Sequence, residues 1–94
     1  MHLAEIADQH YDWLSRMGWL NTTPLEDLAL IASEVGEAVN ECRGDTPSSH
    51  LGEELADIIL RTVGMATHHG IDITKAVGIK MAVNEQRGTR GRLK

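Results

Sequence analysis

Four acidic side chains form two pairs in the middle of the chain. Glu34 and Glu37 make the first pair, Glu54 and Asp57 make the second, and sixteen residues separate the two pairs. The i, i+3 spacing places both carboxylates of a pair on one face of an α-helix, with Cβ atoms about 5–6 Å apart. If the two helices fold back on each other, all four carboxylates converge.

Such a cluster of like charges is unfavourable unless a cation neutralises it. Oxygen ligands without cysteine, and without histidine at ligand spacing, match Mg²⁺ or Mn²⁺ rather than Zn²⁺. Mg²⁺ also tends to keep coordination positions for water and for substrate phosphates. We therefore expect a metal-dependent site that processes phosphates.

Composition indicates which kind of fold positions these acids. Of the 94 residues, 41% are hydrophobic but only 3% are aromatic, and phenylalanine is absent. A core built from Leu, Ile, Val, Ala and Met is typical of packed helices. We expect residues 1–94 to form a single all-α domain. Because so short a chain can build only a modest core, oligomerisation would add buried surface.

Hydrophobic periodicity and turn residues predict four helices, over residues 2–20, 23–43, 49–68 and from residue 72 or 74 to 87. Thr23, Pro24 and Glu26 start the second helix as a capping box with proline at the first position. Its acids lie beside the predicted apolar stripe, which comprises Leu25, Leu28, Ala29, Ala32, Val35 and Val39. Short connections favour antiparallel neighbours in a four-helix bundle.

Groups suited to a nucleotide lie outside the acidic pairs. Lys80, Asn84 and Arg87 share one face of the last helix, where a cation, an amide and a guanidinium suit polyphosphate oxygens. Arg61 shares a strip with the second acidic pair and could meet either the acids or a phosphate. Base-binding candidates are Trp13, Trp19 and Asn21, because aromatic rings stack on nucleobases. His68 and His69 are interpreted as a helix C-terminus.

Charge and cysteine content indicate the partners and the compartment. A net charge of −5 argues against nucleic-acid binding. Residues 87–94 are a basic tail, expected to be either solvated or in contact with phosphate or a partner. One cysteine, Cys42, fits a reducing cytoplasm, and no apolar run suggests a leader or a membrane span. We therefore expect a cytoplasmic protein that does not bind a membrane.

The whole set of motifs resembles the MazG-like branch of the all-α nucleoside triphosphate pyrophosphohydrolases, which are relatives of the dimeric dUTPases. The resemblance covers roughly residues 23 to 87, and its specificity lies in the combination Glu34-x-x-Glu37, Glu54-x-x-Asp57 and Lys80-x-x-x-Asn84-x-x-Arg87. It implies hydrolysis of a nucleoside triphosphate to the monophosphate and diphosphate by a homodimer or a homotetramer arranged as a dimer of dimers.

By position, the four acids match the family's Mg²⁺ or Mn²⁺ ligands, and Lys80, Asn84 and Arg87 match its phosphate-binding motif. The resemblance implies that Glu34 or Glu37 orients or deprotonates the attacking water. Several relatives carry two consecutive glutamates where this chain has Ser33 before Glu34, so a base from that extra acid is missing. Glu53 is a candidate further ligand. Relatives of the dUTPase-like branch usually carry additional helices that this chain lacks, which favours a purine substrate such as dGTP or GTP.

Two other classes of protein also carry acids on helices. A carboxylate-bridged di-iron bundle requires Glu-x-x-His pairs, and Asp57 stands where that histidine would be. The second alternative is a non-catalytic helical oligomerisation module, in which the acids form a solvated face. Stabilisation by Mg²⁺ or Mn²⁺ in the presence of a nucleotide distinguishes the enzyme from the module.

Overall fold

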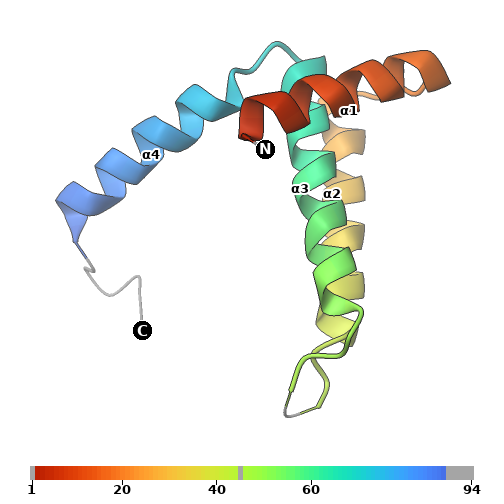
Figure 1. Ribbon diagram of the computed structural model, residues 1–94, viewed down its shortest axis with the longest axis vertical. Coiled ribbons are helices and arrows are strands. Elements are labelled where there is room, and N and C mark those ends of the chain that lie inside the picture. The colour runs from red at the N-terminus through yellow and green to blue at the C-terminus, as the bar shows by residue number, and fades with distance from the viewer. Residues whose placement is uncertain (1, 45, 89–94) are drawn as a thin grey trace.

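A computed structural model of the chain describes residues 2–44 and 46–88. Within these ranges the chain forms helices and no strand, which confirms the all-α prediction. The helices are α1 (Leu3–Met17), α2 (Pro24–Asn40), α3 (Leu51–His68) and α4 (Ile73–Arg87). Figure 1 shows α2 and α3 side by side as an antiparallel hairpin, with α1 crossing one end of it and α4 extending away from that same end.

Local sequence signals set most of the helix ends. The Thr23 side chain accepts a hydrogen bond from the backbone N–H of Glu26, whose side chain accepts one from the Thr23 backbone N–H, as the capping box predicted. Asp72 caps α4 by accepting from the backbone N–H of Lys75. Helix α3 has His50 at its N-cap position, and the His50 side chain makes no capping bond.

A small core holds α1 against the hairpin. Among the described residues, the buried apolar side chains at this junction are Ala7 on α1 and Val63 and Ala66 on α3, whereas the buried Ala38 lies on α2, which α1 does not contact. Gly64 allows α1 to approach α3 closely, since a Cβ there would lie 3.1 Å from Leu14 Cδ1 and 3.3 Å from His10 Cδ2. The buried groups are mostly small, so helix backbones rather than large side chains meet at this junction.

The predicted apolar stripe of α2 does not face the core of the single chain. Leu25 is 77% exposed and Val39 is 61% exposed, while Glu34 is buried. Helix α2 is therefore rotated so that its acidic strip faces α3. Leu55 and Ile59 on α3 are also half exposed, so the hairpin presents apolar side chains to solvent on a surface that α1 does not cover.

Helix α4 departs from the packed four-helix bundle that the sequence suggested. It meets only α1 and α3, makes no contact with α2, and buries none of its own residues within the described chain. Figure 1 shows it diverging from the α2–α3 hairpin. Antiparallel packing is therefore evident for the hairpin, and within the described residues α4 joins the other helices only through its contacts with α1 and α3.

No helix in the described parts is both long enough and apolar enough to cross a membrane. Within the predicted basic tail, residues 89–94 lie outside the described residues, and Arg87 closes α4.

Candidate functional site

Two facing strips of α2 and α3 hold most of the polar groups that could do chemistry. On α2 the strip runs through Asp27, Glu34 and Glu37, and on α3 it comprises Glu54, Asp57, Arg61, Gly64 and His68. Each strip repeats at steps of three, four or seven residues, which keeps its members on one helix face. Because the helices are antiparallel, Glu34 and Glu37 meet the middle and beginning of α3, and Asp27 meets its end.

The predicted acids converge, and we call Glu34, Glu37, Glu54 and Asp57 the acid cluster. Glu34, Glu54 and Asp57 each offer an oxygen atom, and these atoms lie within 4.8 Å of one another. Glu37 is exposed, and its carboxyl lies near enough to that of Glu54 to help raise the pKa of Glu54. Glu53 points elsewhere, with its Oε2 3.6 Å from Nδ1 of His50.

Electrostatics in the acid cluster show a deficit of positive charge. Burial, the hydrogen bond with Glu37, and the charges of Glu37, Glu34 and Asp57 together raise the pKa of Glu54. The Oε2 atoms of Glu34 and Glu54 are buried and have no hydrogen-bond partner among residues 2–44 and 46–88. Buried carboxylate oxygens normally have a partner, so these two orphaned atoms fit ligands of a hard cation such as Mg²⁺ or Mn²⁺.

Arg61 supplies one positive charge at the edge of the acid cluster. Its Nε donates to Glu34 Oε1 at 2.8 Å, and the side chains of Arg61 and Glu34 are 41% and 11% exposed. Of the two roles left open by the sequence, pairing with an acid is the one seen in the structure. The arginine also lines a neighbouring pocket, so it lies at the boundary between the acids and that pocket.

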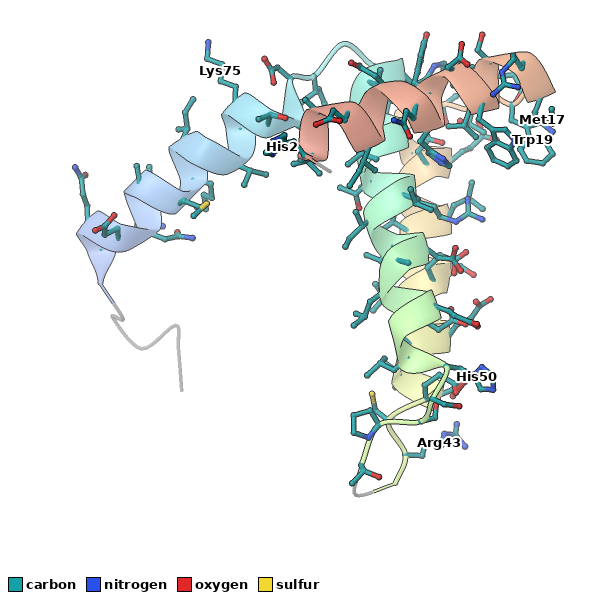
Figure 2. All side chains as sticks on the ribbon, in the orientation of Figure 1. His2, Met17, Trp19, Arg43, His50 and Lys75 are labelled. Carbon is teal, nitrogen blue, oxygen red and sulfur yellow. The ribbon has the colours of Figure 1, made fainter. Side chains whose placement is uncertain are left out.

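The pocket lies one to two helical turns farther along α3 from the acid cluster. It has a volume of about 330 Å³, within the range of small-molecule sites, and is lined from α1, the α1–α2 connection, α2 and α3. Of the three residues predicted to bind a base, Trp19 and Asn21 line this pocket. Trp13 does not, although its ring packs edge-on against Trp19 with centroids 5.2 Å apart. Figure 2 shows Trp19 beside Met17, at the end of α1 far from Lys75 and α4.

Sequence analysis missed several polar residues at the pocket. Asp27 accepts hydrogen bonds from Thr22 Oγ1 and from His69 Nε2, the latter at 2.7 Å. Burial acts to raise the pKa of Asp27, but these two bonds and the neighbouring histidines lower it overall. His10 also lines the pocket, and burial and the nearby Arg61 lower its pKa. Asp27 lies seven residues before Glu34, and this helical spacing could have revealed it.

The predicted phosphate-binding face is not brought to the acid cluster of the same chain. Lys80, Asn84 and Arg87 are exposed on α4, which has no contact with α2 in the described structure. In Figure 2, Lys75 near the start of α4 and Trp19 lie at opposite sides of the hairpin. Within one chain, the acids and pocket therefore stand without these three side chains.

The chain is similar in sequence to a known protein. Over 85 residues the chain is 32% identical to the dATP/dGTP diphosphohydrolase of Cyanophage S-2L, a match that covers 90% of this chain and 75% of that protein. No family model matches the sequence. No solved structure matches it either.

Proposed function

Because this chain belongs to the same family as the dATP/dGTP diphosphohydrolase of Cyanophage S-2L, we propose that it is a nucleoside triphosphate diphosphohydrolase. The reaction would convert a (deoxy)nucleoside triphosphate and water to the monophosphate and diphosphate. The observation that carries the proposal is the acid cluster, with two buried carboxylate oxygens lacking partners, next to a pocket of small-molecule size on the same helix strip.

We propose that the acid cluster binds Mg²⁺ or Mn²⁺ through Glu34, Glu54 and Asp57, with Glu37 beside them. Bound there, the ion would acidify the attacking water and neutralise charge on the phosphates. Of the two candidates to orient the water, Glu37 is the exposed one, whereas Glu34 is buried and bonded to Arg61. Arg61 would use its remaining N–H groups to hold a phosphate, since Nε alone bonds Glu34.

The strip on α3 suggests how a nucleotide lies. Asp57 and Gly64 are seven residues apart, which corresponds to about 10 Å along a helix. This is comparable to the distance between the phosphates and the base of an extended nucleotide. We therefore place the phosphates over the acid cluster and Arg61, and the base in the pocket next to Gly64, Trp19 and Asn21.

A purine base, as in dGTP or GTP, is the favoured occupant. The name of the phage relative specifies purine deoxynucleotides, dATP and dGTP. The residues that line the pocket include the ring-bearing Trp19 and His10 and the hydrogen-bonding Asn21 and Arg61. A bicyclic base would gain more stacking area than a pyrimidine from such a pocket.

A second copy of the chain would complete the site. Helix α4 is largely unpacked, and apolar side chains on α2, α3 and α4 are exposed, including Leu25, Leu55 and Met81. Burying such surface in a homodimer or dimer of dimers would stabilise this small chain. The phosphate-binding face of Lys80, Asn84 and Arg87 would then reach the acid cluster of the partner. Within one chain this face does not reach the acid cluster.

The test is an assay of monophosphate and diphosphate release from the eight common nucleoside triphosphates, with Mg²⁺ or Mn²⁺ and after chelation. We expect metal-dependent turnover with purines preferred. Glu37→Gln should abolish turnover while the protein stays helical, and Asp12→Asn, on the exposed outer face of α1, should retain it. Turnover near normal in Glu37→Gln would contradict the assignment of the acid cluster. Indifference to metal and nucleotide would instead favour the non-catalytic oligomerisation module.

A further inference from the structure

A second group of potential metal ligands lies at the opposite end of the hairpin strips. Asp27 in the first turn of α2 and His68 and His69 at the end of α3 each offer one ligand atom, and these atoms all lie within 4.8 Å of one another. We propose that this His–His–Asp cluster is a separate binding site for Zn²⁺ or a similar nitrogen-preferring divalent ion. This proposal does not depend on the proposed hydrolase activity.

The geometry needs only small side-chain movements to accept an ion. His69 Nε2 lies 2.7 Å from Asp27 Oδ2, and His68 Nε2 lies 3.2 Å from the carbonyl oxygen of Thr22. Zinc binds nitrogen and oxygen ligands at about 2.0–2.2 Å in tetrahedral geometry, which separates neighbouring ligand atoms by roughly 3.4 Å. Rotations of the two imidazole rings would reach this arrangement, and the Thr22 carbonyl or a water could be the fourth ligand.

Proton balance is compatible with binding. Both Nε2 atoms face oxygen acceptors, so in the metal-free structure each carries a hydrogen. A neutral imidazole can hold its proton on Nδ1 instead, which frees the Nε2 lone pair for a metal ion. The ion would thus take the place of the two hydrogens that now join the rings to Asp27 and Thr22, with the carboxylate remaining ionised.

Ligand chemistry separates this site from the acid cluster. The acid cluster contains only carboxylate oxygens, whereas the His–His–Asp cluster contains two imidazoles, and imidazole suits zinc, cobalt and nickel better than magnesium. Asp57 and His68 are eleven residues apart, about 16 Å along α3. Two different ions can therefore bind the same hairpin without sharing a ligand.

The His–His–Asp cluster lies where three segments of the chain meet, so a bound ion would connect them. The ion would join the start of α2, the end of α3 and, through Thr22, the connection between α1 and α2. Asp27, Thr22 and His68 all line the 330 Å³ pocket. Occupancy would therefore fix one wall of that pocket.

Co²⁺, which substitutes for zinc and absorbs visible light, is the probe. The full chain is titrated with Co²⁺ at constant pH. Glu54→Gln/Asp57→Asn, which disables the acid cluster, is titrated in parallel. His68→Gln and His69→Gln each remove one ligand while keeping a hydrogen-bonding side chain. His50→Gln is the control, because His50 is exposed in the turn before α3. Circular dichroism verifies that every variant is folded.

We expect one Co²⁺ per chain with the absorption of low-coordinate cobalt bound by nitrogen, released by Zn²⁺ but not by excess Mg²⁺. The signal should persist in Glu54→Gln/Asp57→Asn and His50→Gln, and binding should weaken by at least about tenfold in His68→Gln and His69→Gln. The proposal is overturned if no such band forms, if both histidine variants bind like the original chain, or if disabling the acid cluster removes the signal.

Discussion

Replacing Arg61 with methionine tests how much the positive charge of this arginine stabilises the acid cluster. Methionine keeps much of the apolar stem but has no hydrogen-bond donor. The substitution removes the 2.8 Å bond from Arg61 Nε to Glu34 Oε1. The second oxygen of Glu34 is already buried without a partner, so the variant leaves this carboxylate without compensation.

The loss of stability can be bracketed from the exposure of the two partners. Leaving a buried acceptor unsatisfied costs about 1–3 kcal/mol. The Glu34 side chain is only 11% exposed, but the Arg61 side chain is 41% exposed, so solvent screening reduces the effect. We expect Arg61→Met to lower the free energy of unfolding by about 1–2 kcal/mol without divalent ions, a factor of roughly 5–30 in the folded-to-unfolded ratio.

Urea unfolding at fixed protein concentration, with and without Mg²⁺, measures this effect. Because a divalent ion in the acid cluster would restore positive charge next to Glu34, Mg²⁺ should stabilise Arg61→Met more than it stabilises the original chain. Arg16→Met is the matched control. Its ion pair with Asp12 is highly exposed, so its loss should cost less than about 1 kcal/mol and show no added response to Mg²⁺.

Two results would refute this reasoning. If Arg61→Met costs no more stability than Arg16→Met, the Glu34–Arg61 pair is not a significant buried interaction. If Mg²⁺ stabilises Arg61→Met no more than the original chain, the ion does not bind close enough to Glu34 to replace the arginine.

Three further predictions test separate parts of the structure. Gly64→Ala should destabilise the protein by about 1–3 kcal/mol in thermal unfolding, because its Cβ would lie 3.1 Å from Leu14; Gly52→Ala, with open space, should be neutral or stabilising by up to about 1 kcal/mol. The pKa of Glu54 is raised above its ordinary value of 4.5, so its stabilising contribution is complete below that value and is lost as pH rises through the higher folded-state pKa. Glu54→Gln should therefore remove this loss. When the free energy of unfolding is measured without metal from about pH 4 upward, where carboxyl groups ordinarily titrate, it should fall less steeply in Glu54→Gln than in the original chain. Thr23→Ala should cost about 1 kcal/mol of unfolding free energy and leave an intact α3, as measured by hydrogen exchange.

Local signals made part of this structure predictable from the sequence. Thr23, Glu26 and Asp72 cap helices through bonds to residues three positions away, so the information lies within one turn. The convergence of Glu34, Glu54 and Asp57 also followed from short-range spacing together with a chain reversal. Their roles as metal ligands remain predictions.

Rotation and partner choice of the helices were not predictable in the same way. Hydrophobicity indicated that Leu25 and Val39 face the core, but they are exposed and Glu34 is buried instead. An apolar stripe shows that a surface needs a partner without showing whether that partner is in the same chain. The pairing of Asp27 with His69, 42 residues apart, depends on the rotation and register of two helices, which neither local segment encodes.

The most direct test of the proposed function is a crystal structure of the protein with Mn²⁺ and a deoxyguanosine triphosphate analogue that has a methylene group between its α- and β-phosphates. The account predicts anomalous manganese density among Glu34, Glu54 and Asp57, phosphates against that density and Arg61, and the base in the pocket beside Trp19. Manganese and phosphates bound away from the acid cluster would contradict it.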